Sequence, residues 1–83
     1  MEYLLFVKFN SGLMHNAIHK TLRNVLESVK QLIYDEGLSA KRESLPTVSK
    51  IKKHLNKYDD YFGQFTNGIW YHIQPQNVFE IVK

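Results

Sequence analysis

The sequence has no cysteine, which excludes disulfide bonds, thiolate catalysis and zinc sites built on cysteine. Glycine is scarce, and its four residues are scattered rather than gathered into a phosphate-binding loop. Long hydrophobic runs are also missing. The apolar run Tyr3–Val7 is five residues long and no basic residue precedes it, unlike a signal peptide or a membrane span. We therefore expect a cytoplasmic protein that does not enter a membrane.

The chain has 83 residues, enough for one small domain spanning 1–83. Hydrophobic residues make up 43% and charged residues 23%, which is typical of a globular rather than a disordered chain. A domain of this size without disulfide bonds depends on its apolar core, which leaves little room for an ordinary enzyme cleft. We expect a non-catalytic protein with no cofactor and no metal.

Hydrophobic periodicity divides the first half of the chain into three segments. Residues 2–9 alternate between two faces and predict a strand. Residues 38–46 are mostly polar and predict a loop with room for one helical turn. Between them, residues 13–36 carry apolar side chains every three or four positions, which predicts one long helix. Its buried stripe would be Met14, Ile18, Leu22, Val25, Leu26, Val29, Leu32 and Ile33.

The second half predicts a helix followed by strands. The helix, at residues 47–58, begins after Pro46 and would bury Val48, Ile51, Leu55 and Tyr58. Strands at 61–66 and 69–74 flank Asn67-Gly68, a pair typical of a two-residue hairpin turn with positive φ at both positions. Pro75 is expected to interrupt the ladder, and residues 78–83 predict a last short strand. The predicted order is β-α-α-β-β-β, which makes this an α+β domain.

Positive charge is concentrated in residues 41–57. This segment carries six basic residues and one acidic residue, a net charge of +5, whereas the rest of the chain carries −2. A helix lined with lysine can neutralise phosphates and so bind nucleic acid with an affinity that falls with salt. The alternative is a solvated helix face, because lysine favours both helices and water.

The segment Pro46–Leu55, with sequence PTVSKIKKHL, resembles the recognition helix of winged-helix DNA-binding domains. The hairpin at 61–74 is similar to the wing of that family, and the strand at 2–9 could pair with it. The resemblance covers about 30 residues of this chain. The family's middle helix has only residues 38–45 to correspond to it here. The resemblance implies a small DNA-binding protein that docks one helix in the major groove.

Nucleic-acid-binding residues follow from this resemblance position by position. Ser49, Lys50 and Lys53 would face bases or phosphates, and Asn56 and Lys57 would lie toward the end of the helix. Lys41 and Arg42, in the preceding loop, would contact the nucleic-acid backbone, and Asn67 would lie at the tip of the wing. Because the helix has no arginine for bidentate reading of guanine, we expect weakly specific binding dominated by phosphates. The resemblance to DNA-binding domains favours DNA over RNA as the ligand. A homodimer is expected if the protein reads a specific site.

The aromatic hairpin supports a second hypothesis. Trp70 and His72, with Phe62 or Phe65, are expected to form an exposed patch that binds a partner or a second copy. The protein would then be an interaction module, an inhibitor or adaptor of the kind that mobile elements encode, and its basic helix could face an acidic protein. Aromatic rings beside lysine could also stack single-stranded bases.

Histidines leave a third hypothesis open. His72 on a strand near the basic helix could transfer protons in a small ribonuclease, although no motif supplies a second acid or base. His15 and His19 are four residues apart, a spacing that places two imidazoles on one side of a helix. Since no third ligand can be named, we expect them to flank the apolar stripe of the helix rather than to bind metal.

Overall fold

The computed structural model describes residues 2–76 and confirms an α+β domain. Its elements follow the order β-β-α-α-α-β-β, so the predicted order was wrong in its first half. They are β1 (Glu2–Lys8), β2 (Met14–His19), α1 (Leu22–Asp35), α2 (Ala40–Glu43), α3 (Val48–Tyr58), β3 (Tyr61–Gln64) and β4 (Trp70–Gln76). The strand predicted at residues 78–83 lies outside the described residues.

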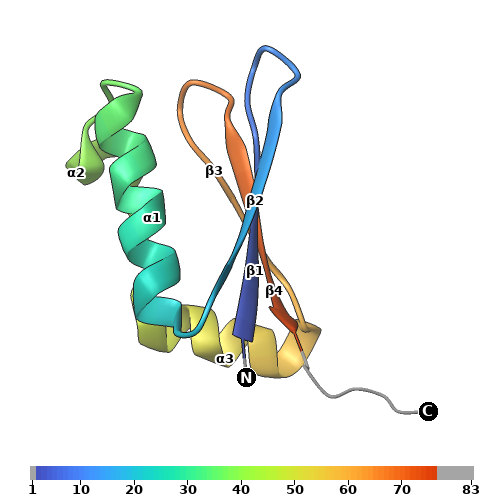
Figure 1. Cartoon of the computed structure of the whole chain (residues 1–83). Coiled ribbons are helices and arrows are strands. Elements are labelled where there is room, and N and C mark those ends of the chain that lie inside the picture. The colour runs from blue at the N-terminus through green and yellow to red at the C-terminus, as the bar shows by residue number, and fades with distance from the viewer. Residues whose placement is uncertain (1, 77–83) are drawn as a thin grey trace.

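The four strands form one antiparallel sheet in the order β2-β1-β4-β3. The central pair is β1 and β4, in a register that places Leu5 opposite Ile73 and Val7 opposite Tyr71. The sheet is seen nearly edge-on in Figure 1, with α1 and α2 on one side of it and α3 crossing its lower end. Within residues 2–76 no helix covers the other side of the sheet, which we call the open face.

The helix predicted at 13–36 is a strand in its first part. Residues 14–19 form β2, which pairs with β1, and the helix begins only after Thr21, whose hydroxyl accepts a hydrogen bond from Asn24 N–H at 3.1 Å. The spacing of Met14 and Ile18 fits one side of a helix, but it also fits one side of a strand. Both side chains lie on the open face, 54% and 61% exposed, rather than in the core.

Two hairpin turns share one sequence pattern and one geometry. In the second turn, Phe65 N–H donates to Ile69 O and Gly68 N–H donates to Phe65 O. This is a three-residue loop with positive φ at Gly68 alone, so the predicted two-residue turn was wrong. Phe9, Gly12 and Leu13 make the same two bonds between β1 and β2. The side chain of Asn10 donates to the backbone oxygen of Asn67 at 2.7 Å and so joins the two turns.

Pro75 does not end β4, contrary to the prediction. The strand continues to Gln76, and Pro75 lies opposite Tyr3 on β1. In an antiparallel pair of strands, every second residue directs its N–H and C=O toward the neighbouring strand. Because Ile69 O accepts from Phe65 N–H, the odd-numbered residues of β4 are those that face β3 in this way. Because β3 pairs only as far as Tyr61, opposite Ile73, Pro75 lies beyond it and needs no N–H there.

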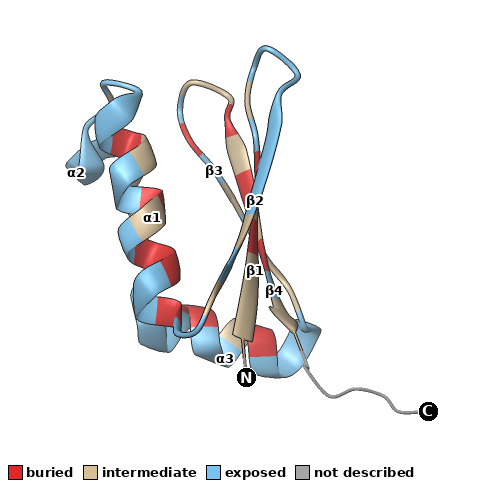
Figure 2. Ribbon diagram, in the orientation of Figure 1, coloured by how far each residue is buried: buried red, intermediate tan, exposed pale blue. Residues whose placement is uncertain are grey.

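The core lies between the helices and the sheet, as the buried residues in Figure 2 show. The strands contribute Leu5, Val7, Phe65, Ile69, Tyr71 and Ile73, and the helices contribute Leu22, Val25, Leu26, Val29, Ile33, Ile51 and Leu55. Two residues expected in the core are largely outside it, because they lie at the ends of α3: Val48 is exposed, and Tyr58 is 56% exposed. Gly63 is packed so closely against Tyr71 that a Cβ there would overlap the phenol ring.

The loop predicted at 38–46 contains the single helical turn for which it had room, α2. Ser39 caps it, with its hydroxyl accepting from Arg42 N–H at 3.4 Å. The carboxylate of Glu43 accepts from both Thr66 N–H, at 2.9 Å, and the Thr66 hydroxyl, at 2.7 Å. These bonds fasten α2 to the turn between β3 and β4.

Candidate nucleic-acid interface

α3 is positioned by a cap at each end and by two buried side chains. The hydroxyl of Thr47 accepts from Lys50 N–H at 3.2 Å, which starts the helix one residue after the predicted boundary. At the other end Asp59, with φ of 62°, donates its N–H to Leu55 O. Ile51 and Leu55 fix the helix on the core. The opposite side of α3 therefore faces solvent.

The solvent-facing side of α3 carries the residues that the sequence assigned to it. We call this surface the basic face: Ser49, Lys50, Lys53, Asn56 and Lys57, all exposed. At 100° per residue these positions fall within an arc of about 120° opposite Ile51 and Leu55. Lys52 lies on the flank of the helix, where it lines a shallow cleft with Tyr3 and Pro75.

The lysines of the basic face have no carboxylate partner in the described part of the chain. The one close approach of a basic and an acidic side chain within residues 2–76 is that of His72 Nε2 and Asp60 Oδ2, which are 3.7 Å apart. Lys53 is three residues from Lys50 and four from Lys57, spacings at which like charges on a helix destabilise it by about 0.2–0.5 kcal/mol per pair. Lys50 also lies in the first turn, where positive charge opposes the helix dipole, and no acidic residue is there to compensate. This arrangement of lysines therefore lowers the stability of α3.

The other predicted contact residues lie elsewhere in the fold. Lys41 and Arg42 are exposed on α2, beside the turn that contains Asn67. Figure 1 shows α2 at one end of α1 and α3 at the other, and α1, with 14 residues, is about 21 Å long. The basic residues of 41–57 thus lie on two different helices, α2 and α3. Asn67 already uses its backbone oxygen and side chain to hold the two turns.

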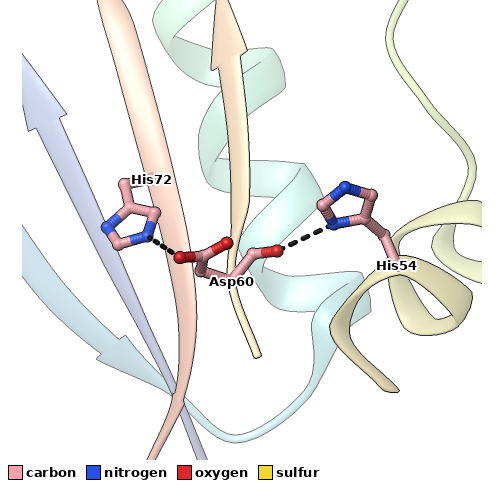
Figure 3. Close-up of polar contacts among 3 residues, drawn as sticks. All are labelled: His54, Asp60 and His72. Carbon is pink, nitrogen blue, oxygen red and sulfur yellow. Dashed lines mark hydrogen bonds and ion pairs between the residues drawn. The ribbon is translucent and has the colours of Figure 1, made fainter. Parts of the chain in front are cut away.

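Asp60 lies between two histidines at the junction of α3 and β3 (Figure 3). Its backbone oxygen is 2.8 Å from His54 Nδ1, and because a carbonyl oxygen can only accept, Nδ1 is the donor. Its carboxylate Oδ2 is 3.7 Å from His72 Nε2, a buried nitrogen with no hydrogen-bond partner within residues 2–76. His72 is stacked on Phe62, with ring centroids 4.3 Å apart. Stacking on Phe62 thus orients the imidazole of His72 beside the carboxylate of Asp60.

Two tyrosines on the core side have raised pKa values. Burial raises the pKa of Tyr71, with a smaller contribution from neighbouring Tyr61. Burial also raises the pKa of Tyr61, which meets the ring of His54 edge-on at 5.2 Å. Both phenols therefore stay neutral at physiological pH.

His15 and His19 lie on β2, not on a helix. Residues four apart on a strand are separated by about 13 Å, so the two imidazoles cannot share one metal ion. Both line a cleft between β2 and α1, where His19 Nε2 is 3.2 Å from the hydroxyl of Ser28. Among the residues described, no group of three potential metal ligands gathers here or elsewhere.

Sequence reasoning predicted only part of the open face and missed its extent across β1 and β2. Trp70 and His72 lie on it, together with Phe62, which is 61% exposed. Phe65, the other ring considered for this patch, is in the core instead. Phe6 and the residues of β2 extend the face across the sheet, but assigning residues 14–19 to a helix concealed them. The repeated pattern Phe-x-x-Gly at Phe9 and Phe65 was the available signal for a second hairpin.

No helix within residues 2–76 has both the length and the apolar character to cross a lipid bilayer.

Comparison of the chain with models of known protein families, with curated proteins and with solved structures gave no match.

Proposed function

We propose that this protein binds nucleic acid without catalysis, duplex DNA in preference to RNA, by placing the basic face of α3 against phosphates. The observation that carries the proposal is the pattern of lysines on α3. They are exposed, lack acidic partners among the described residues, and are spaced so that they repel one another. An anionic partner would remove this repulsion.

The shape of α3 favours a duplex. It has 11 residues, about 16 Å of helix, and a helix fits the major groove of B-DNA, which is about 12 Å wide. Ser49 and Asn56 are the uncharged members of the basic face and would reach base edges, as the winged-helix resemblance implies. Lys41, Arg42 and Asn67, at the other end of α1, would provide a separate second contact.

The test is fluorescence anisotropy of labelled duplex DNA and of single-stranded RNA, titrated with the protein at two salt concentrations. If Lys50, Lys53 and Lys57 each neutralise one phosphate, the affinity should fall about 40-fold between about 50 and 200 mM salt. Replacing Lys53 with Gln should reduce the slope of log K against log salt by about 0.9. Lys30→Gln, on the exposed side of α1, is the matched control and should leave the slope unchanged.

Two results would contradict the proposal. One is the absence of binding to either ligand at the lower salt concentration. The other is binding that Lys30→Gln weakens as much as Lys53→Gln does. Circular dichroism of both variants would show that the fold is retained, so that a loss of binding can be assigned to the lost charge.

A protein-interaction module remains the second candidate, and the open face is the observation that favours it. Phe62 is largely exposed there beside Trp70, with ring centroids 5.6 Å apart. On this hypothesis Trp70→Ala abolishes partner binding, whereas substitution of the lysines on α3 changes mainly the rate of association. Anisotropy measurements with Trp70→Ala and Lys53→Gln would therefore separate the two candidates.

A further inference from the structure

The apolar centre of the open face takes side chains from all four strands, and the polar side chains of Asn16, Gln64, His72 and Gln74 lie among them. Leu4 and Phe6 lie on β1, and Trp70 on β4 lies beside Phe6. The two edge strands add the residues exposed most. These are Met14 and Ile18 on β2 and Phe62 on β3. Contiguous apolar patches that are rimmed by polar residues often mark interaction sites.

Its aromatic rings hold one another in place. Phe6 is stacked with Trp70, with ring centroids 6.1 Å apart and planes at 27°. Phe62 contacts Trp70 on one side and His72 on the other. Rings that are already packed lose little conformational freedom when a partner covers them, so this surface is preorganised for binding.

The charges on the open face are separated by sign along the strands. Lys8 lies at the end near the hairpin turns, opposite Trp70, whereas Glu2 lies at the other end of the same strand, about 20 Å away. Asp60 precedes β3 at the same end as Glu2, and its carboxylate faces His72. A two-fold axis in the plane of the interface and perpendicular to the strands would therefore bring Lys8 of one copy against Glu2 of another.

We propose that the open face is the interface of a homodimer in which two sheets pack face to face, with their strands running in opposite directions. The apolar centres would meet in the middle, as in a β-sandwich, and the charged ends would pair across the axis. The inference does not depend on nucleic-acid binding by α3, which lies outside this surface.

A second copy fits this face better than nucleic acid does. The face carries one lysine and two carboxylates, so phosphates would find no excess of positive charge there. Its own charge pattern, by contrast, is self-complementary. The strands have 7, 6, 4 and 7 residues, which at about 3.3 Å per residue and about 4.8 Å between strands gives a flat area of roughly 400 Å² on each copy. Two copies would bury about 800 Å² in total, which is at the low end of protein interfaces and predicts a weak dimer.

Sedimentation equilibrium of the full chain without nucleic acid tests the proposal. We expect a monomer–dimer equilibrium in the micromolar range, and a shift of Trp70 fluorescence to shorter wavelength as dimer forms. Ile18→Lys and Phe62→Lys should each weaken the dimer at least about tenfold. These residues lie on opposite edge strands, so a dimer that joined through one edge would respond to only one of them. Tyr34→Lys, at an 80% exposed site on α1, is the control and should leave dimerisation unchanged.

Charge exchange tests the direction of packing. Lys8→Glu alone should weaken the dimer, and adding Glu2→Lys should restore it. Failure of the second change to restore it would refute the antiparallel arrangement. A protein that stays monomeric at near-millimolar concentration would refute the dimer. A monomer whose Trp70 fluorescence is quenched by single-stranded RNA would refute it too, because RNA would then be what covers the open face. Lys53→Gln should dimerise normally, so loss of nucleic-acid binding and loss of the dimer can be told apart.

Discussion

Gly63 on β3 gives a sharp prediction about the core. It lies opposite Tyr71, and a Cβ at this position would overlap the ring of that buried tyrosine. Tyr71 cannot move away easily, because its ring packs against Phe65 at 5.5 Å. Gly63→Ala should therefore displace packed side chains, at a cost of about 1–3 kcal/mol.

Part of that cost would be offset, because alanine is better than glycine in a strand by about 0.5–1 kcal/mol. We expect a net loss of about 1 kcal/mol in the free energy of unfolding, or about 4–8 °C in Tm for a domain of this size. Urea and thermal unfolding followed by circular dichroism would measure both. Gln64→Ala, at the exposed neighbouring position, is the control and should change stability little.

A double-mutant cycle with Tyr71→Leu would test the physical cause. Removing the ring removes the overlap, so Gly63→Ala should cost much less in the Tyr71→Leu background than in the original chain. If the two substitutions are additive, or if Gly63→Ala alone stabilises the protein, then the close packing of Gly63 against the ring is not what selects glycine there.

Three further predictions concern alkaline pH, α2 and the turns. Because the folded state holds the proton of Tyr71 more tightly than the unfolded state, stability should fall as pH rises above 10.0, and Tyr71→Phe should flatten that slope in urea titrations at several pH values. Glu43→Ala, which removes both bonds to Thr66, should cost about 1–3 kcal/mol in urea unfolding; a loss no larger than that from Glu27→Ala would contradict it. Gly68→Ala forces alanine to positive φ beside Asn10, so it should lower Tm more than Gly12→Ala, where the space is open; equal losses would exclude a role for Asn10.

The sequence was most informative where local signals agreed. Thr47, the spacing of Ile51 and Leu55 and the lysines between them predicted α3 to within one residue and identified its solvent side. It was ambiguous at residues 14–19, because Met14 and Ile18 satisfy both a helical and a strand period. Pairing with β1 decided between the two, and that is a tertiary effect which no local window contains.

The candidate sites show the same difference between local signals, which the sequence contains, and tertiary effects, which it does not. The basic face could be predicted, since one helix carries it. The open face could be predicted only where the hairpin of β3 and β4 forms it, because the register that adds Phe6 and the residues of β2 is a tertiary effect. Nor could the separation of Lys41 and Arg42 from α3 be foreseen, because it follows from the way Glu43 fastens α2 to the hairpin turn.

The pairing of β1 with β4 has a consequence for how the chain reaches its fold during synthesis. The two central strands are residues 2–8 and 70–76, so the middle of the sheet closes only after β4 has left the ribosome. Until then β1 has only β2 beside it, and a two-stranded hairpin is marginally stable by itself in water. Pairing between such distant segments also slows folding, because the long loop must close before its contacts form. The nascent chain should therefore stay largely unfolded and then fold in one step, shortly after the residues of β4 emerge.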